Sequence, residues 1–408
     1  MKRKSFFLLC SFLLAGLLAA CAAAEAIPSG QEAIPTETQP TEAAAPVMQT
    51  DPLDGIDLLM RQMTLRQKVG QLFIVRPDSL DPTLSQEQID DSKAEGVTTL
   101  TDSMTATLAD YPVGGIIMFA KNITSPAQIT AFNEALQDAS EIPLFISVDE
   151  EGGLVSRLAN NKAFDLPQYE SAAAIEDAAQ AFTMGSTIGS YLSEYGFNMD
   201  FAPVADVNTN PDNPVIGTRA FSSDAQTAAE LASSMAEGLR QQGIIAVFKH
   251  FPGHGDTAED SHSQLAISHK TADEMENCEW LPFLKAGSGD CVMVGHIAVP
   301  EITGDLTPAT MSRQVVSNIL KNQLNFQGLV ITDSLAMGAI TSAYSPGEAA
   351  LGALEAGCDL LLMPNGLQEA FDAVVAAVEN GTYSEAHLDE TVRRILQFKL
   401  DLDLLSFG

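Results

Sequence analysis

Short apolar runs alternate with longer amphipathic stretches through most of the chain, and this alternation limits the possible folds more than any other feature. Eight runs of four or five residues are rich in Ile, Val, Leu and Phe, as buried strands are. These candidate strands are 72–75, 115–119, 144–148, 198–202, 245–249, 291–295, 329–332 and 360–363. Helical periodicity lies between them, in stretches such as 126–139, 172–195, 225–242 and 368–379. Strands separated by helices are expected to pair in parallel, because a long crossover returns the chain to the same end of the sheet.

Eight strand–helix units predict an α/β fold, a (β/α)8 TIM barrel that forms a single catalytic domain over residues 51–408. Each of the last seven runs is followed at once by polar residues, Gly or Pro, as expected where the loops at one end of a barrel carry the chemistry. A doubly wound open sheet is the alternative, but no Gly-rich phosphate-binding loop follows any run. The sequence therefore places the functional residues at the carboxyl ends of the strands.

The first 20 residues have the pattern of an export signal peptide. A positively charged start precedes an apolar core that is too short to span a bilayer. The sequence Leu-Ala-Ala before Cys21 resembles the bacterial lipobox, where the signal is cut and the cysteine acylated. Residues 21–50 are rich in Ala, Pro, Thr and Glu and are expected to form a disordered tether. We therefore expect an exported lipoprotein, anchored through Cys21 to the extracytoplasmic face of a bacterial membrane. A plain secretory signal with a chance cysteine is the alternative.

The charge and the cysteines exclude some classes of protein. A net charge of -33 argues against nucleic acid as a partner, because phosphates would be repelled. Cys278, Cys291 and Cys358 lie beyond the tether, and an odd number in an exported domain argues against a disulfide framework. Buried thiols are expected, with a Cys278–Cys291 bridge as the alternative.

Ionisable residues follow five of the candidate strands. A single one is readily explained as a satisfied polar group at a barrel rim, but five at one end indicate a shared crater. They are Asp149, Glu150, Glu151 and Arg157 after 144–148; Asp206 and Arg219 after 198–202; Lys249 and His250 with 245–249; His296 after 291–295; and Asp333 after 329–332.

Residues 249–262, Lys-His-Phe-Pro-Gly-His-Gly-Asp-Thr-Ala-Glu-Asp-Ser-His, contain three of the six histidines of the chain. Their Pro and Gly residues predict a loop that leaves a strand end. One interpretation is a turn whose histidines bind backbone groups, and another is a dyad in which Asp260 fixes the tautomer of His262. The two are separated by one residue, so an extended backbone places both side chains on one face. A third interpretation is a metal site, although Lys249 would repel a divalent ion. Its ligands would be His250, His254, Asp256 and His262.

Three segments resemble glycoside hydrolase family 3, in its β-N-acetylhexosaminidase branch. They are Val-Asp-Glu-Glu-Gly-Gly at 148–153 with Arg157, the stretch 249–262, and Ile-Thr-Asp-Ser-Leu-Ala-Met at 331–337. The resemblance covers residues 58–400, and the Asp-Ser-His at 260–262 separates this branch from the β-glucosidases of the family. One departure is Leu154, where the family usually has Arg, and it leaves Arg157 as the expected sugar contact.

The resemblance implies the mechanism of a retaining glycosidase. Asp333 would be the nucleophile and His262 the acid/base, with Asp260 as its partner. The terminal sugar would be held by Asp149, Arg157, Arg219, Lys249 and His250. A retaining mechanism needs a carboxylate at the anomeric carbon and a proton donor at the leaving oxygen. Imidazole suits the second task, since its ordinary pKa of about 6.5 lets it donate and accept near neutral pH. From the chemistry alone, other donors are equally open: Glu150, Glu151, Asp256 and Glu259.

We therefore expect an exo-β-N-acetylglucosaminidase, or β-N-acetylhexosaminidase, that removes terminal β-linked N-acetylglucosamine from cell-wall fragments in peptidoglycan turnover. It is expected to act as a monomer without a metal or a cofactor. One Trp and 6% aromatic residues favour a pocket for one sugar over a long cleft. The alternatives are a phosphorylase of the same family, a metal-dependent hydrolase, and a sugar-binding lipoprotein without catalysis.

Overall fold

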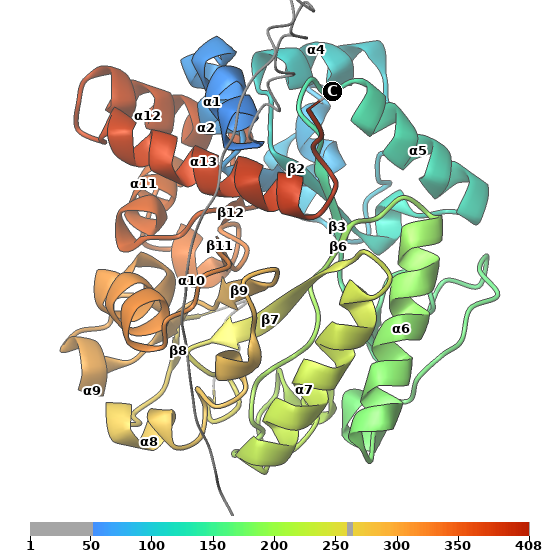
Figure 1. Cartoon of the computed structure of the whole chain (residues 1–408), viewed down its shortest axis with the longest axis vertical. Helices are drawn as coiled ribbons and strands as arrows, with labels where there is room; N and C mark the ends of the chain where they lie inside the picture. Colours follow the sequence, from blue (N-terminus) through green and yellow to red (C-terminus); the bar gives the residue numbers. More distant parts are fainter. Residues whose placement is uncertain (1–51, 259–263, 408) are drawn as a thin grey trace, which may run out of the picture. The chain divides into compact units, whose positions relative to one another are not determined.

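The computed structural model describes residues 52–258 and 264–407 (Figure 1). Eight parallel strands form one sheet in the order β11-β9-β7-β6-β3-β2-β1-β12. Their bounds are β1 Phe73–Val75, β2 Gly115–Met118, β3 Phe145–Val148, β6 Met199–Asp200, β7 Ile245–Phe251, β9 Cys291–Val294, β11 Leu329–Thr332 and β12 Leu361–Leu362. No predicted strand end differs from these bounds by more than two residues. The largest extension is in β7, which continues through Lys249 and His250 to Phe251.

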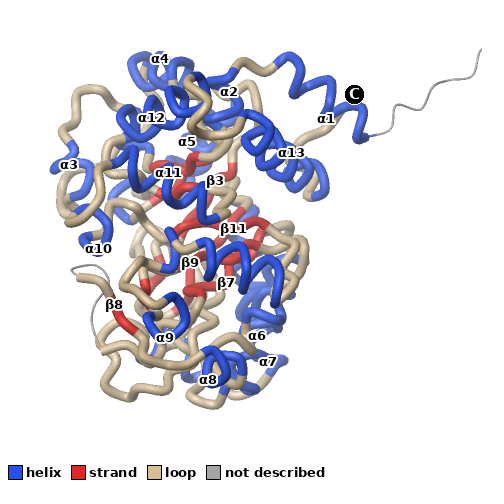
Figure 2. Tube along the Cα trace, turned by 90° about the vertical axis from the view of Figure 1, so that its left-hand side faces the viewer, coloured by secondary structure: helices blue, strands red, loops and turns tan. Residues whose placement is uncertain are grey.

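The two outer strands of this order meet, and the sheet is a barrel. The backbone N–H of Thr332 donates to the Leu360 carbonyl at 3.0 Å, and that of Leu335 donates to the Leu362 carbonyl at 2.9 Å. Figure 2 shows the strands in the middle of the described part, with helices around them. The predicted (β/α)8 TIM barrel is confirmed.

The helices that connect or flank the strands include the four that the periodicity predicts, at Pro126–Asp138, Ala178–Glu194, Ala225–Arg240 and Leu367–Glu379. Their bounds are α1 Pro52–Gln62, α2 Leu65–Gly70, α3 Gln86–Asp90, α4 Asp102–Asp110, α5 Pro126–Asp138, α6 Ala178–Glu194, α7 Ala225–Arg240, α8 Ala272–Glu276, α9 Pro300–Thr303, α10 Gly338–Thr341, α11 Pro346–Ala356, α12 Leu367–Glu379 and α13 Glu385–Asp401. A π-helix covers Gln314–Gln323. The helix predicted over 172–195 begins later, because a 3-10 turn at Ala172–Ala174 precedes α6. Capping fixes several starts; Ser345, for example, forms a capping box with Glu348 before α11.

Helices α6 and α7 pack unusually closely, and two glycines allow it. A Cβ atom at Gly185 would lie 2.0 Å from the carbonyl oxygen of Met235, and one at Gly238 would lie 2.3 Å from that of Phe182. Both distances are shorter than any real Cβ contact. The side-by-side course of the two helices is visible in Figure 1.

Two short pairings lie at the carboxyl end of the barrel. Strands β4 (Glu150–Gly152) and β5 (Val155–Ser156) form an antiparallel hairpin after β3. Strands β8 (Ala266–Ile267) and β10 (Ile297–Ala298) pair in parallel.

Three further observations bear on the sequence predictions. Cys278, Cys291 and Cys358 are free thiols, so the alternative of a Cys278–Cys291 disulfide is wrong. None of the described helices has the length and apolar character that crossing a membrane requires. The described residues all belong to one compact unit within residues 50–408. Cys21 and residues 21–50 lie outside the described residues.

Candidate active site

The carboxyl ends of the barrel strands surround one cavity of about 390 Å³. Seven of the ionisable residues predicted at the strand ends line it together: Asp149, Glu151, Arg157, Arg219, Lys249, His250 and Asp333. Ligand pockets usually measure about 300–1,000 Å³, so this cavity is at the small end of the range. Its size suits a single sugar ring better than a long oligosaccharide.

One wall of the cavity is a buried network of ion pairs between β3 and β7. Lys249 Nζ lies 2.8 Å from Asp149 Oδ1 and 2.6 Å from Glu151 Oε1. Arg219 binds the same Glu151 with two nitrogens, at 2.8 and 2.7 Å. The network therefore fixes side chains from three separate strand ends in one place.

The carboxyl groups and the amine in this network stay ionised because their opposite charges stabilise one another. Burial is the largest single effect on the pKa of Asp149 and of Glu151 and raises both, but the cations around them together outweigh it. Lys249 makes the largest opposing contribution at both, with help from Arg157 and Arg219 at Asp149 and from Arg219 at Glu151, so the pKa of each carboxyl group falls below its ordinary value. Burial lowers the pKa of Lys249, and the two carboxylates reverse this, so that its pKa is raised. The wall presents fixed charges to a ligand without needing to reorganise.

Arg157 continues this wall from the β4–β5 hairpin. Its Nη2 lies 3.3 Å from Asp149 Oδ2, and its guanidinium carbon lies 5.5 Å from the ring centre of Phe119. The hairpin is held by Glu150, whose carboxylate accepts hydrogen bonds from the backbone of Arg157, Leu158 and Ala159 and from the Tyr191 hydroxyl. Glu150 is thus a structural anchor, a role that the sequence did not predict.

Asp206 organises the start of the histidine-rich loop. Its Oδ2 lies 2.8 Å from His250 Nδ1, and its Oδ1 accepts the backbone N–H of His254 at 2.7 Å. Burial lowers the pKa of His254, and the charge of Asp206 offsets this only in part, so this imidazole is neutral near pH 7. His254 Nδ1 lies 2.6 Å from the hydroxyl of Thr257. The arrangement holds His250 and His254 at the cavity wall.

Asp333 is positioned by the backbone that follows β11. Its N–H donates to the Val294 carbonyl at 2.8 Å, and its Oδ1 accepts the Ser334 N–H at 2.7 Å. Buried His296 has Nε2 2.8 Å from the Ser334 carbonyl and Nδ1 2.9 Å from the Thr310 hydroxyl. His296 therefore holds the turn that carries Asp333.

The predicted acid/base His262 and its partner Asp260 lie outside the described residues, as does Glu259. Two other carboxylates considered as proton donors are occupied by the protein. Glu151 belongs to the ion-pair network, and Asp256 Oδ2 accepts a hydrogen bond from Ser268 at 2.6 Å. In the part of the chain that the structure describes, no three His, Cys, Asp or Glu side chains are grouped to hold a metal ion.

A closed barrel that brings ionisable side chains from several strand ends into one small cavity defines a TIM-barrel enzyme. Residues 64–398 match the family described as "Glycosyl hydrolase family 3 N terminal domain", and the chain belongs to this family.

Two curated relatives are β-hexosaminidases. The chain is 32% identical over 336 residues to β-hexosaminidase A of Pseudoalteromonas piscicida, covering 75% of this chain and 56% of the relative. It is 34% identical over 272 residues to a β-hexosaminidase of Stenotrophomonas maltophilia (strain K279a), covering 64% and 80%. The chain thus spans little more than half of the Pseudoalteromonas protein.

Similar solved structures include a β-N-acetylglucosaminidase and a β-N-acetylhexosaminidase. A family 3 β-N-acetylglucosaminidase from Paenibacillus sp. str. FPU-7 superposes with a TM-score of 0.76 at 37% identity, over 85% of this chain and 64% of that one. A β-N-acetylhexosaminidase from Beutenbergia cavernae DSM 12333 gives 0.72 at 28% identity, over 83% and 99%.

Proposed function

We propose that the protein is a retaining exo-β-N-acetylglucosaminidase, or β-N-acetylhexosaminidase, that acts through a covalent intermediate on Asp333. The observation that carries the proposal is that Asp333 lines the same cavity as the charged wall of Asp149, Lys249 and Arg219. Such a wall suits the hydroxyl groups of a sugar, and a carboxylate beside it suits attack on the anomeric carbon. The similar proteins include β-hexosaminidases and a β-N-acetylglucosaminidase, which supports the choice of an N-acetylamino sugar.

In the first step, an oxygen of Asp333 attacks the anomeric carbon, and the bond from this carbon to the leaving oxygen breaks. The leaving oxygen takes a proton from His262, with Asp260 as the partner of the imidazole. In the second step, His262 accepts a proton from water, and the water oxygen replaces Asp333 at the anomeric carbon. The sugar is released with its original configuration.

The wider role is also a proposal. The lipobox-like end of the signal, with Cys21, supports export and a lipid anchor at the extracytoplasmic face of a bacterial membrane. There the chain would remove terminal N-acetylglucosamine from peptidoglycan fragments as a monomer. The cavity of about 390 Å³ supports attack at chain ends.

The test compares the full-length protein with its Asp333→Asn variant on aryl β-N-acetylglucosaminide and aryl β-glucoside. We expect the wild type to cleave the first and the variant to be inactive while its circular dichroism is unchanged. After reaction with a slow fluorinated substrate, peptide mapping by mass spectrometry should find the sugar attached to the peptide that contains Asp333. Activity in the variant, or a label elsewhere, would remove the assignment.

Product analysis in phosphate buffer separates hydrolysis from phosphorolysis. A hydrolase gives the free sugar at every phosphate concentration, whereas a phosphorylase gives a sugar 1-phosphate. Binding of N-acetylglucosamine without any cleavage would instead indicate a sugar-binding protein.

A further inference from the structure

One side of the active-site cavity has no role in the mechanism above. It is formed by Arg76 after β1, Phe119 after β2 and Met363 after β12, with Asp90 from α3. These residues lie on the far side of the barrel from Lys249. In the ring of eight strands, β1 is four positions from β7 in either direction.

Arg76 is held in a defined position at this side. Its Nη1 donates to Asp90 Oδ1 at 2.7 Å and to the Ile89 carbonyl at 2.8 Å. Its guanidinium carbon lies 5.2 Å from the ring centre of Phe119, the same ring that Arg157 approaches. A guanidinium that is stacked and paired loses little freedom when it binds a further group.

The loop that supplies these contacts is itself anchored. Lys121 Nζ donates to the Ile89 carbonyl at 2.8 Å, and Asn122 Nδ2 donates to Asp78 Oδ2 at 2.8 Å. Both anchors follow β2, so the loop after β1 is tied to the neighbouring strand end. Contacts with the end of β2 therefore hold the loop that positions Arg76.

This side of the cavity offers a donor that the protein does not use. Within residues 52–258 and 264–407, no side chain or carbonyl accepts a hydrogen bond from Arg76 Nη2. The nearby carboxylates are already engaged, since Asp90 accepts from Arg76 and Gln86. Asp149 is engaged in the same way by Lys249 and Arg157. A ligand that bears an anionic acceptor fits this combination.

We propose that Arg76 is a specificity-determining residue that binds a carboxylate carried by the leaving part of the substrate. This inference rests on the proposed function, which places the terminal sugar on the side of β3 and β7 and the scissile bond at Asp333. The part of the substrate that points away from β7 then reaches Arg76. In a chain of net charge -33, the unused Nη2 donor of Arg76 is a local positive group that can bind an acidic leaving group.

The test measures kcat/KM for two disaccharides with the same terminal N-acetylglucosamine. The leaving sugar is N-acetylmuramic acid in one, which bears a carboxylate, and N-acetylglucosamine in the other, which is neutral. The quantity compared is the acidic-to-neutral ratio. Arg76→Gln should lower this ratio by about 10- to 100-fold, the effect of losing a charge-assisted hydrogen bond. Arg76→Lys should restore part of it, because it keeps the charge without the planar fork.

Asp90→Asn gives the opposite prediction. It removes the negative charge beside Arg76 and keeps an oxygen that accepts the Nη1 bond, so the ratio should rise several-fold. A purely structural role of the Arg76–Asp90 pair would make both variants lose activity on both substrates alike.

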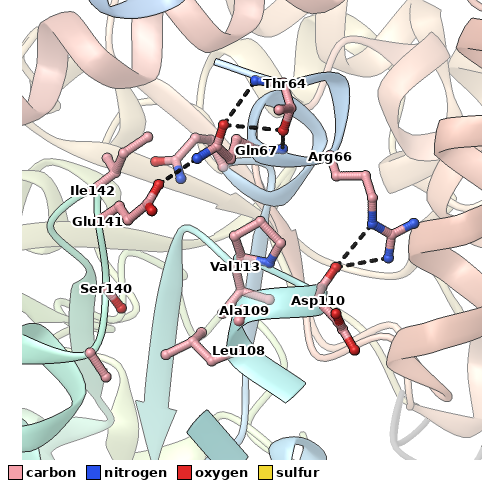
Figure 3. A pocket seen from close by; sticks show the side chains of 13 residues that line it. Thr64, Arg66, Gln67, Leu108, Ala109, Asp110, Val113, Ser140, Glu141 and Ile142 are labelled. Atoms are coloured by element: carbon pink, nitrogen blue, oxygen red, sulfur yellow. Dashed lines mark hydrogen bonds between the residues drawn. The ribbon is translucent and has the colours of Figure 1, made fainter. Parts of the chain in front are cut away.

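Arg66→Gln is the matched control. Arg66 also pairs with an aspartate, Asp372 at 2.9 Å, and lies 4.7 Å from the ring centre of Phe371. However, it lines a different cavity, before β1, where its side chain also binds the Asp110 carbonyl (Figure 3). This variant changes the net charge equally and should leave the ratio unchanged.

Two results would overturn the inference: an unchanged ratio in Arg76→Gln, or a ratio that shifts equally in Arg66→Gln. Failure of the proposed function looks different, because the wild type would then cleave neither disaccharide and no aryl N-acetylglucosaminide.

Discussion

Arg219 and Glu151 form a two-nitrogen ion pair, with Nε 2.8 Å from Oε2 and Nη2 2.7 Å from Oε1. Their side chains are only 14% and 3% exposed, and Lys249 shares the same carboxylate. A surface pair in the same protein offers a contrast, because Arg66 and Asp372 lie 2.9 Å apart with side chains 40% and 53% exposed. Removing one partner of a buried pair leaves an uncompensated charge in the interior, whereas a surface charge is simply solvated.

We expect Glu151→Gln to lower the free energy of unfolding by about 3 kcal/mol or more, as is usual for a broken buried pair. Asp372→Asn should lower it by about 1 kcal/mol at most. Urea denaturation of both variants measures the difference. Equal, small losses would mean that water reaches the Glu151 site and screens it.

The role of His262 is tested by the quality of the leaving group. A good leaving group departs with little protonation, so His262→Ala should slow an aryl glycoside less than a disaccharide. General acid catalysis contributes roughly 10²–10⁴-fold, and the loss on the disaccharide should fall in this range. The measurement is kcat/KM for each substrate in wild type and variant. Equal losses on the two substrates would limit His262 to substrate binding.

Lys399 predicts a pH dependence of stability. Its Nζ is fully buried and donates to Gln71 Oε1, the Gly114 carbonyl and the Pro143 carbonyl at 2.9, 3.1 and 2.6 Å. Burial lowers its pKa from 10.5 to about 7. Between pH 7 and 10.5 the unfolded chain then binds a proton that the native protein lacks, so this group makes stability rise with pH. The slope is at most about 1.4 kcal/mol per pH unit.

The measurement is the free energy of unfolding of wild type and Lys399→Met from pH 6.5 to 9.5. The difference between the two removes the contribution of every other titrating group. The wild type should gain on the variant as the pH rises. A flat difference would mean that the three oxygen acceptors keep the ammonium charged throughout.

The close contact of α6 and α7 predicts an unfavourable Gly→Ala substitution inside a helix. Alanine usually stabilises a helix, but at Gly185 its methyl group would meet the Met235 carbonyl. We expect Gly185→Ala to lower stability by about 1–3 kcal/mol, the range for overpacking. Gly289→Ala is the control, because nothing lies within 4 Å of the added atom there and its φ is ordinary. A stabilised Gly185→Ala would show that the helices can separate without cost.

Much of the fold was predictable because the strands are short, apolar and bounded by loop-forming residues. Runs such as 291–295 and 329–332 lie at the centre of the barrel, where burial on both faces demands such composition. The hairpin of β4 and β5 was not predictable. Its strands are two and three residues long and lack an apolar alternation, and it is held by Glu150, which contacts backbone groups seven to nine positions later.

The residues of the site were predictable from the sequence, but the contacts between them were not. The sequence places Asp149, Lys249 and Asp333 at strand ends, and the barrel brings all three to one cavity. It gives no signal that Glu151 binds Lys249, because the two are about a hundred positions apart and meet only when β3 and β7 are folded into one ring. Arg76 and Phe119 were missed for the same reason.

The small volume of the cavity predicts that the enzyme releases a long glycan after each cut. A crater with room for about one ring cannot keep hold of a glycan while the chain slides forward by one unit. After each cut both fragments must leave, and the shortened chain must find a mouth again. A mixture of long glycans should therefore shrink evenly, with every intermediate length appearing in the time course, rather than some chains vanishing while others stay whole.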